Sequence, residues 1–188
     1  MKHILIIIAH PKKKSFSFAM ADTYEKTMLA KGHTVEILDL YRDPNQQPFL
    51  HYEDANTLRQ TPEMQYYQEK IAAADELVFI FPYWWGSSPA ILKNFIDWNF
   101  SKGFAFTYVN SRPQGLLQGK TVKIFTTTGA PSLIYTLTGA NRRLKNMFKA
   151  QIVEFCGMKL EGFHSFGSVD TSAKNTDKIL EKITKLYS

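Results

Sequence analysis

Two adjacent tryptophans and a tyrosine stand in the segment FPYWWGSSPAILKN, residues 81–94, directly after an apolar run. Protein cores seldom take three consecutive large rings from one turn, so Tyr83, Trp84 and Trp85 indicate a surface for a flat ligand. The alternative, in which these rings only fill the core, stays open at this point.

A polar segment, AHPKKKSFSF, follows the first apolar run of the chain. Ser15 and Ser17 offer hydroxyl groups, and His10 offers a ring N–H. The helix expected to begin here offers free backbone N–H groups and the positive end of its dipole, a set that suits a phosphate group. The segment has no glycine, so it is neither a dinucleotide fingerprint nor a P-loop. The alternative is that Ser15 or Ser17 only caps the helix.

A third segment, TTTGAPSLIY, combines hydroxyl groups with Gly129 and Tyr135. Glycine lets backbone N–H groups approach the edge of a ring without obstruction by a side chain. Such donors would stabilise negative charge that develops on a reduced heterocycle. The alternative is an ordinary polar turn with a satisfied tyrosine.

Short, mostly unalternated apolar runs are typical of strands that are covered on both faces, and 3.6-residue periodicity marks helices between them. The order predicts a flavodoxin-like three-layer α/β sandwich, with a five-stranded parallel sheet in the order 2-1-3-4-5 and helices on both faces, in one domain over residues 1–188. The strands are expected at 4–8, 33–40, 76–81, 122–128 and 159–165, and the helices at 17–31, 61–74, 88–100, 144–155 and 179–187.

The carboxyl ends of parallel strands lie at one edge of a sheet, where ligands of such folds bind. The three polar segments follow strands one, three and four, so we expect them to meet there. The longest expected loops are 41–60 and 101–115, and long loops of this kind are usually functional or mobile.

The 188 residues carry a formal charge of +6, with 44% hydrophobic and 14% aromatic residues. This charge leaves nucleic acid, a membrane surface or an anionic small ligand open as partners. The single cysteine, Cys156, and the absence of a cleavable leader or a membrane-spanning run predict a cytoplasmic protein.

Three other features of the sequence do not indicate the sites that they resemble. GLLQGKT, at 115–121, has three residues between its glycines where a Walker loop has four. The five histidines show no spacing of metal ligands, so no metal is expected. The basic clusters at 12–14 and 142–145 lack the pattern of an RNA-binding module, so no nucleic-acid partner is expected.

The motifs AHPxxxSFS, FPxxWxxxPAxLKxxxD, GFAFTY and TTGAPxxxYxxxG follow in this order between about Ile4 and Gly157. Together they resemble the NAD(P)H:quinone oxidoreductase family of flavodoxin-like flavoproteins. The resemblance implies a homodimer that binds a flavin, FMN or FAD. It implies that NAD(P)H reduces the flavin and a quinone or similar acceptor reoxidises it, in two-electron steps with ping-pong kinetics.

The resemblance also implies roles for individual residues. Tyr135 would help the flavin accept charge, and Asn141 stands where the animal enzymes have a histidine. Asparagine can form hydrogen bonds but cannot titrate near neutrality. Phe106 and Tyr108 would cover the substrate pocket across the dimer. The implied flavin-binding residues are His10, Ser15, Phe16, Ser17, Pro82, Tyr83, Trp84, Trp85, Gly86, Thr127, Thr128, Gly129, Ala130 and Tyr135.

Three further departures bear on the cofactor and the pocket. Trp84 stands in place of a glutamine, Gly86 in place of a phenylalanine, and Thr176 in place of an arginine near the adenine of FAD. FMN and FAD therefore both stay open. Alternative functions are a flavodoxin-type electron carrier, a redox-sensing regulatory subunit of a membrane transporter and, last, a basic nucleic-acid binder.

Overall fold

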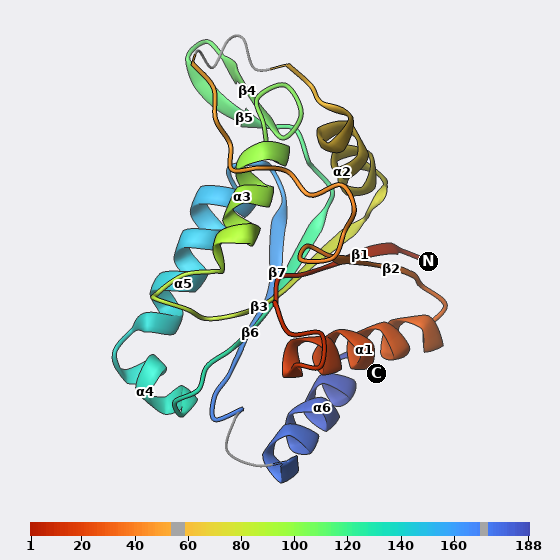
Figure 1. Cartoon of the computed structure of the whole chain (residues 1–188), viewed down its shortest axis with the longest axis vertical. Coiled ribbons are helices and arrows are strands. Elements are labelled where there is room, and N and C mark those ends of the chain that lie inside the picture. The colour runs from red at the N-terminus through yellow and green to blue at the C-terminus, as the bar shows by residue number, and fades with distance from the viewer. Residues whose placement is uncertain (54–58, 170–172) are drawn as a thin grey trace.

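The computed structural model describes residues 1–53, 59–169 and 173–188 (Figure 1). Its main feature is a parallel sheet in the order β2-β1-β3-β6-β7. Counted within this sheet, the order is 2-1-3-4-5, so the predicted topology is confirmed. The strands are β1 (His3–Ile8), β2 (Thr34–Asp39), β3 (Glu76–Pro82), β6 (Thr121–Thr127) and β7 (Lys159–Phe166).

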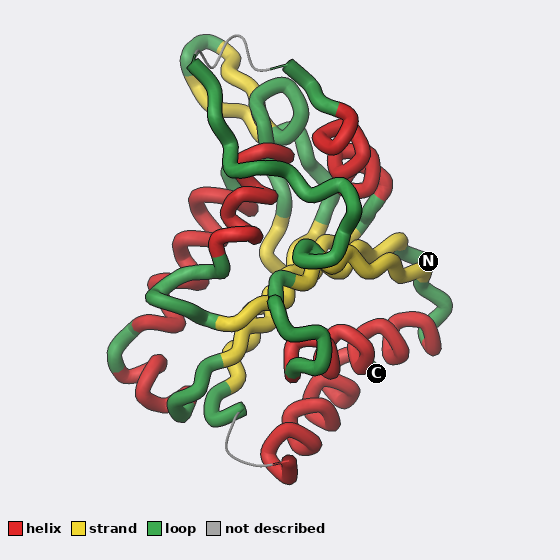
Figure 2. Tube along the Cα trace, viewed as in Figure 1, coloured by secondary structure: helices red, strands yellow, loops and turns green. Residues whose placement is uncertain are grey.

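Helices cover both faces of this sheet, and Figure 2 shows the strands running between them. Helices α1 (Phe16–Ala30) and α6 (Ala173–Tyr187) pack on one face. Helices α2 (Pro62–Ala73), α3 (Ala90–Asn99) and α5 (Ala140–Phe148) pack on the other. The predicted three-layer arrangement is therefore confirmed.

Strand β1 shows why the apolar runs do not alternate with polar residues. Leu5 and Ile7 point into the core beneath α2, α3 and α5, whereas Ile4, Ile6 and Ile8 point into the core beneath α1 and α6. All five side chains are completely buried. Each such burial stabilises the fold by about 1.5–3 kcal/mol, so both faces of the strand must be apolar.

The predicted loop at 101–115 contains a hairpin of β4 (Phe106–Val109) and β5 (Arg112–Gly115). Asn110 and Ser111 connect the strands with φ angles of 50° and 62°. A two-residue connection with both φ angles positive matches the twist of a hairpin, and asparagine tolerates this conformation. The strands are exposed and short, which explains why the sequence pattern does not reveal them.

Three other local features differ from the expectation. The helix predicted from Ser88 begins two residues later, at Ala90, with Pro89 as its N-cap. The helix predicted through Phe155 ends at Phe148 and continues as a π-helical turn, Lys149–Val153. A short helix, α4 (Ser132–Leu137), occupies the third polar segment. By contrast, Thr61 caps α2 as predicted, because its hydroxyl accepts from Met64 N.

The long loop at 41–60 is held against α3 where the structure describes it. Asn94 Nδ2 donates to the carbonyl oxygens of Gln47 and Pro48 at 3.0 and 3.1 Å. Trp98 Nε1 donates to Pro48 O at 2.7 Å. This stretch is therefore fixed by hydrogen bonds, and residues 54–58 lie outside the described part.

A buried ionic cluster closes the amino end of the sheet, opposite the turns that follow the strands. Glu76 is 1% exposed, and Lys123 Nζ lies 2.7 Å from its Oε2. Tyr24 donates its O–H to Glu76 Oε1 at 2.5 Å. Burial alone would raise the pKa of Glu76, but the bonds from Lys123 and Tyr24 outweigh it and lower that pKa.

Replacement of Lys123 tests this cluster. We expect Lys123→Met to lower the free energy of unfolding by about 3 kcal/mol, because the Glu76 charge stays buried without its main partner. The double variant Glu76→Gln/Lys123→Met should recover most of this loss. Because the folded-state pKa of Glu76 is lowered, its stabilisation is complete above about pH 4.5 and is lost as the pH falls below that value.

Urea unfolding at pH 7 and pH 3.5 measures these differences. Lys159→Met, at an exposed lysine on the neighbouring strand, is the control and should stay within about 0.5 kcal/mol of the wild type. Equal stability of Lys123→Met and wild type at pH 7 would contradict a stabilising role for the buried pair.

Candidate functional site

Three turns meet at the carboxyl edge of the sheet and line one cavity of about 280 Å³. They follow β1, β3 and β6, which are neighbours in the sheet. The sequence predicted this meeting from the strand order alone. The lining residues are His10, Lys12, Lys14, Ser15, Phe16, Ser17, Pro82, Tyr83, Trp84, Thr127, Thr128, Gly129 and Val169.

The first turn brings two unpaired hydroxyl groups to this cavity at the start of α1. Ser15 is the N-cap residue of α1, yet its side chain makes no capping hydrogen bond. The hydroxyl oxygens of Ser15 and Ser17 are buried and have no partner within the described residues. A buried polar group without a partner is costly and rare. Ser15 thus occupies the N-cap position of α1 without a side-chain cap, and binding of a ligand by the two hydroxyls stays a prediction.

Lysines and a fixed backbone complete this end of the cavity. Lys12 and Lys14 both line it. Nδ1 of His10 lies 3.1 Å from the backbone N and from the backbone O of Lys12. These contacts fix the imidazole against the backbone of the loop. Arg42 donates to Pro11 O and pairs with Asp39 at 2.9 Å, which ties the loop to β2. The result is a rigid, positively charged pocket.

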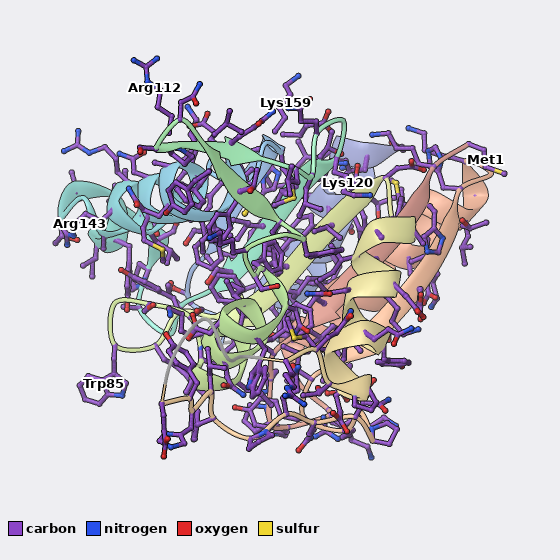
Figure 3. All side chains as sticks on the ribbon, turned by 90° about the horizontal axis from the view of Figure 1, so that it is seen from above. Met1, Trp85, Arg112, Lys120, Arg143 and Lys159 are labelled. Atoms are coloured by element: carbon purple, nitrogen blue, oxygen red, sulfur yellow. The ribbon has the colours of Figure 1, made fainter. Side chains whose placement is uncertain are left out.

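The second turn sends its three rings in different directions. Trp84 and Ser87 exchange backbone hydrogen bonds of 3.0 and 2.9 Å around Trp85 and Gly86, whose φ angles are 50° and 80°. Trp84 lines the cavity, with its ring centroid 6.1 Å from that of His10. Trp85 is fully exposed, and Figure 3 shows its ring pointing away from the molecule. The structure therefore does not bring Trp85 and Gly86 into the cavity.

The third turn contributes Thr127, Thr128 and Gly129 to the lining, and Ala130 supports it from behind. Ala130 O accepts hydrogen bonds from Thr128 Oγ1 at 2.9 Å and from Ser168 N at 3.2 Å. These bonds hold the turn against the segment that follows β7. The turn therefore presents a fixed backbone to the cavity.

Neither Tyr135 nor Asn141 lines the cavity, but Tyr135 contacts a residue that does. The Tyr135 ring meets the Tyr83 ring edge to face, with centroids 5.3 Å apart. Asn141 Nδ2 lies 3.4 Å from Thr136 Oγ1, and the Oδ1 atom of Asn141 is buried without a partner among the described residues. The structure thus places Tyr135 next to a cavity residue but turns the Asn141 amide nitrogen toward α4.

Phe106 and Tyr108 lie on the hairpin, at the end of the molecule opposite α4 (Figure 1). Phe106 packs edge to face on Phe155 at 4.9 Å and lines a second, more apolar cavity of about 480 Å³. Cys156 also borders this cavity, and burial raises the pKa of its thiol to about 11. Within one chain, the predicted substrate-covering residues are therefore separate from the cavity at the sheet edge.

Sequence reasoning missed three residues of the first cavity. The basic cluster at 12–14 was tested only as a nucleic-acid site, although the position of Lys12 and Lys14 between His10 and Ser15 places them in the first polar segment. Val169 follows the edge strand β7, and no residue type or motif marks it.

The described residues contain neither a membrane-spanning helix nor a group of side chains placed to bind a metal ion. No helix within 1–53, 59–169 and 173–188 is both long enough and apolar enough to span a membrane. The same residues contain no group of three or more histidine, cysteine or acidic side chains placed to hold a metal ion.

Comparison with known proteins finds a matching family and several similar proteins. The family described as having a flavodoxin-like fold matches residues 2–187. A protein of Haemophilus influenzae described as an uncharacterized NAD(P)H oxidoreductase is 33% identical over 173 residues, which cover 90% of this chain and 85% of the relative. Human ribosyldihydronicotinamide dehydrogenase (quinone) is 32% identical over 182 residues, which cover 85% of this chain and 78% of the relative.

This chain is also similar to a solved structure, in both sequence and fold. The crystal structure of a protein from Streptococcus mutans UA159 is 32% identical, covers 98% of both chains and superposes with a TM-score of 0.82. The sheet order, the cavity at the carboxyl edge of the sheet and these similarities lead to one conclusion: the chain belongs to the NAD(P)H:quinone oxidoreductase family of proteins with a flavodoxin-like fold.

Proposed function

We propose that this chain is an oxidoreductase that uses a bound flavin nucleotide to move hydride from NAD(P)H to a quinone-like acceptor. The names of its relatives, which include NAD(P)H oxidoreductases and a quinone dehydrogenase, point to this substrate pair. The observation that carries the proposal is the pair of buried, unpaired hydroxyl groups of Ser15 and Ser17 at the start of α1.

The residues around these hydroxyls fit the phosphate of a flavin nucleotide. A phosphate accepts several hydrogen bonds and is favoured at the positive end of a helix dipole. Ser15 and Ser17 would donate to its oxygens, while Lys12 and Lys14 neutralise its charge. Because α1 runs for 15 residues, its amino end carries a full dipole.

The other end of the cavity fits a planar ring. Trp84 and Tyr83 offer aromatic surface on one side, and the turn at Thr127–Gly129 offers backbone on the other. Gly129 leaves room for N–H groups to face the ring edge. The flavin, when bound there, supplies the hydride-accepting and hydride-donating chemistry. The chain itself would bind and orient the ring, and Tyr135, whose ring contacts Tyr83, would donate its phenol O–H to the bound ring.

We infer that a second copy of the chain binds over the apolar cavity at the hairpin. Phe106, Ile152 and Phe155 border it, and Tyr108 is 52% exposed beside it. Burial of such a surface against an identical one would form a homodimer. In that dimer, Phe106 and Tyr108 of one chain would cover the acceptor pocket of the other.

Flavin binding is tested with matched ligands and variants. We expect Ser17→Ala to weaken binding of FMN, or of FAD, by about tenfold or more, because a hydrogen bond to a charged phosphate is lost. Riboflavin, which has no phosphate, should bind the variant and the wild type equally. Absorbance and fluorescence titrations of the apoprotein measure both affinities. If neither flavin nucleotide binds the wild type, the proposed function fails.

Turnover tests the enzymatic part of the proposal. We expect the flavin-loaded protein to oxidise NADH or NADPH with a soluble quinone, and double-reciprocal plots at several quinone concentrations should give parallel lines. Steady-state absorbance at the nicotinamide band measures the rate. A protein that binds flavin but shows no such turnover with either donor would be an electron carrier instead.

The homodimer is tested by charge at the apolar cavity. We expect Phe155→Asp to convert the protein to monomers, because a buried carboxylate in an apolar interface is strongly unfavourable. The monomer should keep its flavin affinity and lose quinone turnover, since the acceptor pocket needs the partner chain. Size-exclusion chromatography with light scattering gives the mass. Gln151→Asp, at an exposed position bordering the same cavity, is the control for added charge.

A further inference from the structure

Helix α4 lies at the rim of the cofactor cavity and has almost no buried surface of its own. Leu133, Ile134 and Leu137 are 65%, 51% and 78% exposed. Of the six residues of α4, all of which the structure describes, only Tyr135 is not exposed. An isolated helix of this length is unstable in water, so tertiary contacts must hold α4 in place.

The hydrogen bonds around α4 fix its two ends. At the start, Ala130 O accepts from Ser168 N, which ties the preceding turn to the segment after β7. At the end, Arg143 Nη1 donates to Thr138 O at 2.9 Å, which ties the helix to α5. None of these bonds reaches the Tyr135 ring, so they do not set its direction.

Among the described residues, the ring contact of Tyr135 is with Tyr83 alone. The two planes meet at 66° with centroids 5.3 Å apart, the edge-to-face geometry that aromatic pairs favour. Tyr83 is itself held firmly, because its N–H donates to Thr127 O at 2.8 Å and its ring packs against the core. Tyr83 is therefore anchored to the sheet edge, and its ring gives Tyr135 an aromatic contact there.

We infer that Tyr83 is a positioning residue: its ring holds α4 against the cavity rim and directs the Tyr135 phenol toward the site. The role of the phenol in the reaction depends on the proposed function, but the hold on α4 does not. Asn141 also contacts α4, because its Nδ2 donates to Thr136 Oγ1 at 3.4 Å, but this bond is made beside Tyr135 and not to its ring.

Hydrogen exchange of the apoprotein tests the hold on α4. We expect Tyr83→Leu, which keeps apolar volume but removes the ring, to speed exchange of the amides at 133–138 about two- to tenfold. Tyr83→Phe keeps the ring and should match the wild type. Trp85→Leu removes an exposed ring from the same turn and should also leave α4 unchanged. Mass spectrometry of peptides that cover this segment gives the rates.

A double-mutant cycle separates a direct contact from general loosening. If the rings hold each other, Tyr83→Leu and Tyr135→Leu together should speed exchange no more than the larger single effect. Additive effects of the two substitutions, or unchanged exchange in Tyr83→Leu, would overturn the inference.

Kinetics of the loaded enzyme test the positioning of the phenol. Because Tyr83 also lines the proposed flavin site, Tyr83→Leu is assayed at saturating flavin and its flavin affinity is measured beside the kinetics. We expect kcat to fall by about tenfold while the KM for NAD(P)H changes little, because misplacement of a catalytic group costs rate and not uniform binding. Tyr83→Phe should restore kcat. A variant that loses α4 protection but keeps full kcat would refute the catalytic consequence.

The exchange experiments need no flavin, so their outcome is independent of the proposed function. Absence of flavin binding in the wild type would remove the proposed function and leave the hold on α4 standing. Normal flavin binding with unchanged α4 exchange in Tyr83→Leu would remove this inference alone.

Discussion

The parallel pairing of β1, β3 and β6 is the constraint on which the candidate site depends. Parallel strands place all their carboxyl ends at one edge, so turns from distant parts of the chain must meet there. Backbone bonds continue this pairing past the strands, from Ala9 N to Ile80 O and from Tyr83 N to Thr127 O. The sheet therefore sets the relative positions of the turns that line the cavity.

The buried polar groups at the two ends of the sheet differ in whether they have hydrogen-bond partners. At the amino end, Glu76 is fully paired with Lys123 and Tyr24, so the buried charge stabilises the fold and offers nothing to a ligand. At the carboxyl end, the hydroxyl oxygens of Ser15 and Ser17 are buried without a partner among the described residues. Unmade hydrogen bonds of buried groups cost free energy, and the proposed phosphate of a flavin nucleotide would offset this cost. This difference between the two ends supports the carboxyl end as the candidate site.

The residues at the cavity rim are more exposed than the strand and helix residues beneath it. The floor is strand and helix with fully buried side chains, whereas α4 and the turn at Trp84–Ser87 expose large apolar surfaces. Trp85 adopts a left-handed backbone conformation that bulky residues rarely take, and its ring lies in solvent. Such strain and exposure concentrate at functional edges of proteins. At this rim, the Tyr135 ring of α4 meets the Tyr83 ring edge to face, with centroids 5.3 Å apart.

The sequence by itself determined the sheet and the location of the site. Apolar runs such as Ile4–Ile8 are readable because burial on both faces demands them, and strand order then brings the three polar segments together. Only the tertiary structure decided the direction of individual side chains. The Trp85 ring lies in solvent, on a turn with positive φ angles. The Ser15 hydroxyl has no partner in the part of the chain that the structure describes. Phe106 lies on a hairpin away from the cavity. These outcomes depend on contacts between distant segments, which local sequence patterns do not encode.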